Sequence, residues 1–269
     1  MSLLNHALRA GRTQPPATPS TPRTVLVAGG GGALGSAVLE ALLAGRNFAP
    51  VRVLATRALS TAMQGLEPIV VDDIGIDVAP ESGVAPIADT ALIVFDRERH
   101  ANGRELAFLR PAPQDLMPIA RWLHRRGVRA LVVVLPHSPA SLPDALKSGL
   151  ANLDEQAAAA LGFEQLVFVR SAQAPTNARA AQWLQRLADG VLAQMQMMVA
   201  SSHQPVRAGK VARFVAELAV QLGGVVPGTR VAPPELVWQA AQLRDPAALV
   251  EAWLAARELP EVSAPRKRW

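Results

Sequence analysis

Five glycines within seven residues are the part of this sequence best suited to binding chemistry. They are Gly29 to Gly32 and Gly35, and they stand between an apolar run that ends at Ala28 and a helical stretch near Ala33 to Leu43. One glycine allows a sharp turn off a strand, another lets the backbone approach a diphosphate, and a third lets helix pack on strand. The helix N-terminus adds unpaired N–H groups and a positive dipole. The segment therefore predicts a dinucleotide-binding loop.

The glycines fit two spacings. These are GxGxxG at Gly30, Gly32 and Gly35, and GxxGxxG at Gly29, Gly32 and Gly35. A flexible turn without a ligand is the alternative interpretation, and the strand and helix on either side argue against it. The candidate cofactor-binding residues of the loop are Gly29, Gly30, Gly31, Gly32, Ala33, Leu34 and Gly35.

The choice of cofactor depends on the residue that follows the second expected strand. An acidic residue there would bind a ribose 2′-hydroxyl, whereas an arginine would accommodate a 2′-phosphate. The sequence reads Leu54-Ala55-Thr56-Arg57 and has no carboxylate at this point. Arg57 therefore favours NADP(H) over NAD(H), with an ordinary solvated arginine as the alternative.

Further segments are similar to a known family. They are the acid Asp73 after Val70-Val71-Asp72, then Asp89-Thr90-Ala91, and Leu161–Leu166 leading to Val169-Arg170. Together with the glycine loop, the stretch 24–239 resembles the atypical short-chain dehydrogenase/reductases, specifically their NAD(P)H-binding, NmrA-like members. The resemblance implies that Asp73 and Ile74 lie beside the adenine. A helix cap or loop acid is the other interpretation of Asp73.

Enzymes of that family use a serine at the end of the fifth strand and a tyrosine and lysine spaced as YxxxK on the next helix. Residues four apart share a helix face, so the lysine can lower the pKa of the tyrosine, which passes a proton to the substrate. Aligned without gaps, the three positions fall on Val134, Leu146 and Leu150, and the chain contains no tyrosine at all. The resemblance thus implies a cofactor loop without the usual proton-transfer residues.

Weak substitutes follow the fifth expected strand. His137 and Ser138 could in principle move a proton near neutral pH, and Lys147 lies further along the chain. Pro136 and Pro139 frame the His–Ser pair, which is typical of an ordinary surface loop. We therefore assign no catalytic residue.

The elements that must position these residues alternate between strands and helices. Short β-branched runs predict strands at Thr24–Ala28, Val51–Thr56, Pro68–Asp72, Ala91–Phe95, Ala130–Leu135 and Gln165–Val169. Helices are expected near Ala33–Leu43, Gln114–Arg126 and Ala145–Ala160. This alternation predicts an α/β fold, a doubly wound, mostly parallel sheet of Rossmann type whose ligand crevice lies at the carboxyl ends of the strands.

The pattern changes after Arg170, and we expect a small helical lobe from about residue 171. Its expected elements are helices at Ala178–Val199, Val211–Gln221 and Pro246–Glu258 and a short extended piece at Thr229–Val231. The domain spans 24–262, preceded by a proline-rich, disordered leader at 1–23 and followed by a basic tail at 263–269.

Composition excludes several classes of function. The chain of 269 residues has no cysteine, which removes disulfides and thiolate sites and fits a reducing, cytoplasmic compartment. Its net charge is +5, and its basic side chains are overwhelmingly arginine, which together with abundant alanine suggests a bacterial coding sequence. The histidines are scattered, so no metal site is expected. Arginines near Arg121–Arg129 fall at the end of a helix, where a solvated terminus is the simpler explanation than a nucleic-acid patch. No apolar run approaches the ~20 residues that a membrane span needs.

The sequence therefore predicts an NAD(P)(H)-binding protein that is non-catalytic or weakly catalytic, serving as a redox sensor, regulator or assembly partner. The alternative is an NADPH-dependent oxidoreductase acting on activated enones, quinones or carbonyls. A third class is a scaffold that no longer binds nucleotide. A protein partner or a homodimer stays open.

Overall fold

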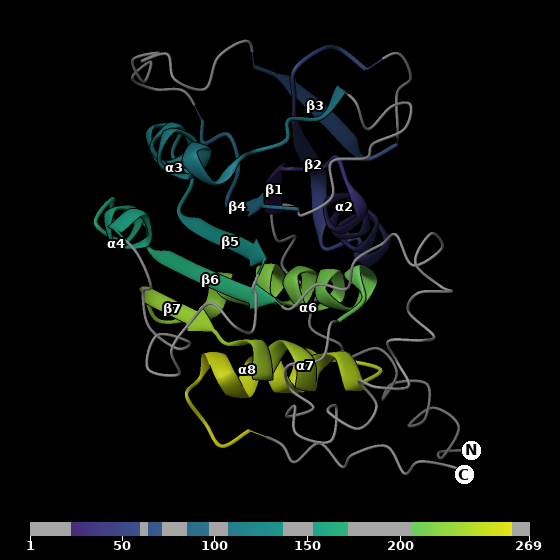
Figure 1. Ribbon diagram of the computed structural model, residues 1–269, viewed down its shortest axis with the longest axis vertical. Coiled ribbons are helices and arrows are strands. Elements are labelled where there is room, and N and C mark those ends of the chain that lie inside the picture. The colour runs from purple at the N-terminus through teal and green to yellow at the C-terminus, as the bar shows by residue number, and fades with distance from the viewer. Residues whose placement is uncertain are drawn as a thin grey trace, which may run out of the picture.

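Seven parallel strands form one sheet in the computed structural model, in the order β3-β2-β1-β4-β5-β6-β7 (Figure 1). The structure describes residues 23–59, 64–71, 85–96, 107–136, 153–171 and 206–259. The strands are β1 (Arg23–Ala28), β2 (Phe48–Ala55), β3 (Leu66–Val70), β4 (Thr90–Val94), β5 (Ala130–Pro136), β6 (Gln165–Ser171) and β7 (Gly228–Ala232). The order makes this a doubly wound sheet, as the sequence predicts. It reverses beside β1, which has β2 on one side and β4 on the other, so the ligand crevice of such a fold lies at the carboxyl ends of β1 and β4.

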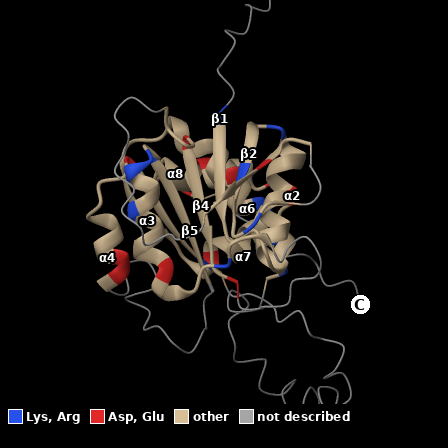
Figure 2. Ribbon diagram, turned by 90° about the horizontal axis from the view of Figure 1, so that it is seen from above, with Lys and Arg blue, Asp and Glu red and all other residues tan. Residues whose placement is uncertain are grey.

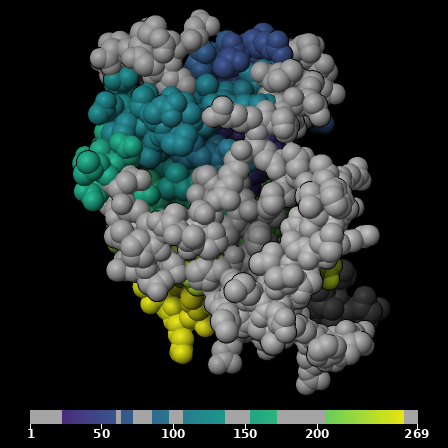
Figure 3. All heavy atoms as spheres, in the orientation of Figure 1, coloured from purple at the N-terminus to yellow at the C-terminus, as the bar shows by residue number. Residues whose placement is uncertain are grey.

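Helices cover both faces of the sheet (Figure 2). They are α2 (Ala33–Gly45), α3 (Leu116–Arg125), α4 (Leu153–Ala159), α6 (Ala208–Gln221), α7 (Pro234–Gln242) and α8 (Ala247–Leu254). Helices α2 and α6 lie on one face, and α3 and α4 on the other. In the space-filling view α3 and α4 form the teal and green surface along one side (Figure 3).

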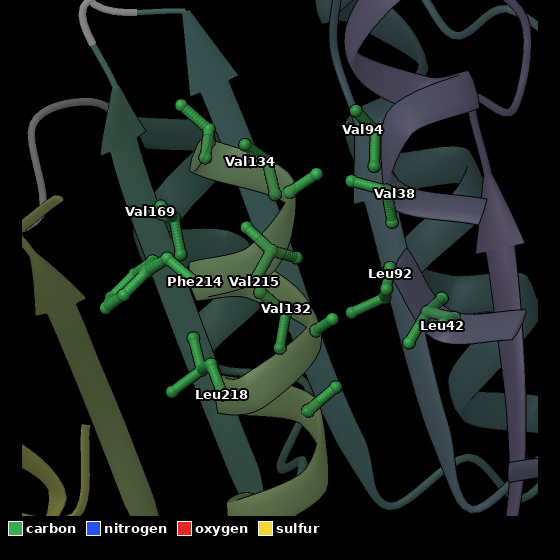
Figure 4. Close-up of a cluster of buried hydrophobic side chains, with 14 of the residues drawn as sticks. Val38, Leu42, Leu92, Val94, Val132, Val134, Val169, Phe214, Val215 and Leu218 are labelled. Atoms are coloured by element: carbon green, nitrogen blue, oxygen red, sulfur yellow. The ribbon is translucent and has the colours of Figure 1, made fainter. Parts of the chain in front are cut away.

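The core follows the two-residue period of the strands. In β4, Leu92 and Val94 point to the face of α2 and α6, whereas Ala91 and Ile93 point to the face of α3 and α4. Both sets are buried, as expected of a parallel sheet covered on both sides. Figure 4 shows the first set: valines of β5 and β6 meet Phe214, Val215 and Leu218 of α6, and residues of β4 meet Val38 and Leu42 of α2.

A buried ion pair fixes the first turn of α4 to the end of β6. Glu155 and Arg170 are 2.9 Å apart, with side chains 3% and 2% exposed. Removing one partner of such a pair leaves a charge uncompensated in the interior, which typically costs about 3–5 kcal/mol. The pair therefore holds α4 in place at the carboxyl edge of the sheet.

The seventh strand corrects the sequence analysis, which expected six strands. Residues 229–231 belong to β7, which pairs in parallel with β6 from Gln165↔Gly228 to Val169↔Ala232. This strand lies at the edge of the sheet and carries polar Thr229 and Arg230, so it lacks the apolar run that marks the central strands. Helix α6 also belongs to the layers of the main sheet, because it packs on β5 and β6.

The helices of the structure differ from the expected ones at α7. Helix α7, which the sequence analysis missed, begins at Pro234, a residue that suits the first position of a helix. The expected helix 178–199, the leader and the basic tail lie outside the described residues, apart from Arg23 in β1. Of the helices in the described ranges, none has both the length and the apolar character that crossing a bilayer requires.

Candidate functional site

The glycine loop joins the end of β1 to the start of α2 and depends on backbone angles that favour glycine. Gly29 has φ 107° and Gly32 has φ 111°, in the left-handed half of the Ramachandran plot. Space is limiting as well, since a Cβ on Gly29 would lie 2.1 Å from the carbonyl oxygen of Val94. Any side chain at position 29 would therefore push the loop away from β4.

Gly35 allows α2 to pack directly on the end of β1. A Cβ on this residue would lie 1.8 Å from the carbonyl oxygen of Gly29 and 3.0 Å from the carbonyl carbon of Gly30. A Cβ on Gly30 would also come closer than 3 Å to other atoms, but these belong to side chains, those of Leu39 and Val53, each at 2.8 Å. The strictest backbone requirements thus fall on Gly29, Gly32 and Gly35, which is the GxxGxxG spacing.

The N-terminus of α2 is bound by a carboxylate that follows strand β4. The Leu34 N–H donates to Asp96 Oδ2 at 2.7 Å. Helix α2 has no acidic residue in its first turn, and its N-cap Gly32 has no side chain to offer. Asp96 follows β4 at the carboxyl edge of the sheet, so its negative charge faces the positive end of the α2 dipole.

Residues 107–112, called here the covering segment, continue the sheet beside β2 where β1 has ended. The Thr56 N–H donates to the carbonyl of Ala107 at 2.8 Å, and the Leu109 N–H donates to the carbonyl of Leu54 at 2.8 Å. Phe108 forms an antiparallel bridge with Ala55 between these bonds. The segment thereby satisfies backbone groups of β2 that β1 leaves unpaired.

The covering segment also touches the glycine loop. Pro111 Cδ lies 3.3 Å from the place of a Cβ on Gly29, and the ring of Phe108 lies 3.3 Å from that of Gly30. A pocket of about 440 Å³ lies beside these contacts. It is lined by Gly31, Val94, Asp96, Arg110, Pro111, Ala112, Pro113 and Gln114. The pocket therefore lies at the carboxyl ends of β1 and β4, with both an acidic and a basic residue in its lining.

Of the other candidate residues named in the sequence analysis, the structure describes Arg57 and Val134. Arg57 is exposed two residues beyond the end of β2, and Val134 is fully buried in the core between β5 and α6. Asp73, Ile74, His137, Ser138, Leu146, Lys147 and Leu150 lie outside the described residues. Across the described ranges, no group of three or more His, Asp or Glu side chains could hold a metal ion.

Sequence reasoning missed Asp96 and the covering segment. A signal for Asp96 existed, since an acid directly after a buried strand lies at the carboxyl edge, the same argument that singled out Arg57. No comparable signal marks the covering segment, because its partners in β2 are about 50 residues away along the chain.

No family model and no curated protein match this chain. Among solved structures, the enzyme WbmG of Bordetella bronchiseptica in complex with NAD is similar at 17% identity and a TM-score of 0.48, over 83% of this chain and 79% of that one. A Rossmann-fold NAD(P)-binding family protein of Shigella flexneri is similar at 12% identity and a TM-score of 0.47, over 78% of this chain and 93% of that one. UDP-N-acetylglucosamine 4-epimerase of Bacillus cereus is similar at 16% identity and a TM-score of 0.43, over 78% of each chain. At these values nothing about ligand or activity follows for this chain.

Proposed function

We propose that this chain binds a dinucleotide at the glycine loop, NADP(H) in preference to NAD(H). The observation that carries the proposal is the junction of β1 and α2. There Gly29 and Gly32 adopt left-handed backbone angles, Gly35 lets the helix pack on the strand end, and the helix begins where the strand order of the sheet reverses. This is the geometry in which helix N–H groups bind a diphosphate.

The residues at this junction suit a diphosphate in charge and in shape. Helix α2 carries no acid of its own in its first turn, and its N-cap Gly32 contributes no side chain that would fill the place of a phosphate. The backbone of residues 29–34 would hold the diphosphate, with the α2 dipole attracting its charge. When bound, a nicotinamide dinucleotide supplies a hydride donor or acceptor.

Arg57 is the residue that we assign to the 2′-phosphate. The Arg57→Ala variant should bind NADPH about tenfold more weakly, roughly 1.4 kcal/mol, and NADH with little change, because only NADPH carries the group that a guanidinium pairs with. Isothermal titration calorimetry of the full chain with both cofactors measures this. Arg121→Ala is the matched control, since Arg121 is an exposed arginine on α3. Equal losses for the two cofactors would remove Arg57 from this role, and no binding of either cofactor would reject the proposal.

We infer further that the bound dinucleotide is sensed more than it is used, so the protein acts as a redox sensor, regulator or assembly partner. A reductase must protonate the oxygen that receives the hydride's electrons. The chain has no tyrosine, and Val134, at the position of the family's serine, is 0% exposed inside the core. Both facts favour a binding role over turnover.

A further inference from the structure

We propose that Asp96 holds the glycine loop in a closed form, in which its carboxylate takes the position of a diphosphate at the N-terminus of α2. The inference rests on the proposed function of the loop and adds a gate to it. Dinucleotide binding then requires Asp96 to leave, and the covering segment to move with it.

Asp96 accepts a hydrogen bond from the first turn of α2. Leu34 is the second residue of α2, and the N–H groups of the first turn have no partner within the helix. Its bond to Asp96 Oδ2 is 2.7 Å long, short for a bond from a backbone N–H and typical of one to a charged acceptor. Because α2 offers no capping side chain of its own, the Asp96 carboxylate, two residues beyond β4, supplies the anion that this helix end attracts.

Asp96 and a diphosphate would compete for the same end of α2. The same N–H group cannot serve a carboxylate and a phosphate oxygen equally, and two negative charges at this distance repel each other. The dipole that would attract the diphosphate is already compensated by Asp96. The carboxylate is therefore a competitor for the site that is part of the protein itself.

The covering segment closes the neighbouring part of the crevice. The four glycines of the loop, Gly29 to Gly32, are buried, and Phe108 is only 6% exposed. Phe108 lies against Gly30 and Pro111 against Gly29, where the chain passes over the end of β1. Two backbone bonds to Leu54 and Thr56 fasten this cover to β2. A ligand that reaches across the carboxyl ends of β1 and β2 must displace it.

A closed form lowers the apparent affinity by the fraction of molecules that are open. Replacing Asp96 removes the competing charge and favours the open form. We therefore expect Asp96→Asn and Asp96→Ala to bind NADPH at least about tenfold more tightly than the wild-type chain. The test is calorimetric titration of the full chain with NADPH and NADH.

Asp89→Asn is the matched control. Asp89 also accepts a backbone N–H bond, from Thr24 at 2.8 Å, but it does so at the amino end of β1, on the opposite edge of the sheet. Its replacement should leave NADPH affinity unchanged. Thermal unfolding adds a second measurement: without ligand, Asp96→Ala should unfold at a lower temperature than wild type, and NADPH should raise its midpoint by more than it raises that of wild type.

The outcomes separate the gate from the proposed function. Tighter binding by the Asp96 variants, with the Asp89 control unchanged, supports both. If wild type binds NADPH and the Asp96 variants bind it with equal or lower affinity, the gate is overturned and dinucleotide binding stands. Failure of wild type and variants alike to bind either cofactor overturns both. If Asp96→Ala does not fold, Asp96→Asn keeps the shape of the side chain and gives the same comparison.

Discussion

Replacing Gly35 with alanine is expected to lower the free energy of unfolding by about 3 kcal/mol. The added Cβ would lie 1.8 Å from the carbonyl oxygen of Gly29 and 2.9 Å from its carbonyl carbon. These neighbours are backbone atoms in a turn that Gly29 already holds at a left-handed φ, so they cannot yield as a flexible side chain would. Helix α2 must instead move away from β1, and the loop between them loses its shape.

Gly209→Ala is the control that isolates this clash. Gly209 is the second residue of α6, as Gly35 is the third residue of α2, and a Cβ on it would meet nothing within 4 Å. Because alanine is the better helix former, this variant should gain up to about 1 kcal/mol. Urea denaturation of both variants measures the difference. Equal effects of the same sign would show that close packing of α2 on the strand end does not determine stability here.

Mixed with NADPH and a simple ketone, the protein is expected to oxidise the cofactor at least about 10²-fold more slowly than a reductase with a positioned proton donor. Hydride transfer to a carbonyl leaves an alkoxide that must be protonated. The chain contains no tyrosine, and a buried valine, Val134, stands where the resembled enzymes have a serine, so no side chain of these two kinds can supply the proton. Activated enones and quinones need less acid assistance and should be the better substrates, if any is turned over.

Stopped-flow absorbance with a panel of ketones, enones and quinones makes this measurement. The double variant His137→Ala/Ser138→Ala is its control, because these residues are the substitutes that the sequence offers. Turnover of a simple ketone at rates usual for enzymes, retained in the double variant, would contradict the binding role. Turnover of enones or quinones alone would instead favour the alternative function, an NADPH-dependent oxidoreductase.

Local patterns were sufficient to predict most of the sheet. The central strands are continuous apolar runs because both of their faces are covered, and all six strands expected from such runs occur within a few residues of their expected bounds. Strand β2 begins at Phe48, three residues earlier than expected, because it includes Pro50, a residue that is rare within strands. Strand β7 was missed as a member of the sheet because an edge strand needs less apolar surface.

The glycine loop could be found from sequence because its requirements lie within seven neighbouring residues. The contacts that close it could not, because each of them joins two distant parts of the chain. Asp96 meets Leu34 across 62 residues, and Ala107 meets Thr56 across 51. Such pairings are set by the order of strands in the sheet, which brings the ends of β1, β2 and β4 together only after folding.

Hydrogen–deuterium exchange of the full chain, with and without saturating NADPH, tests most directly that the glycine loop is the dinucleotide site. Bound cofactor is expected to slow exchange in peptides that cover residues 29–36, and to speed it in those that cover 107–112 as the Leu109 N–H loses its bond to Leu54. Peptides from α6 should not change. Unchanged exchange at residues 29–36, or protection confined to another part of the chain, would contradict the account.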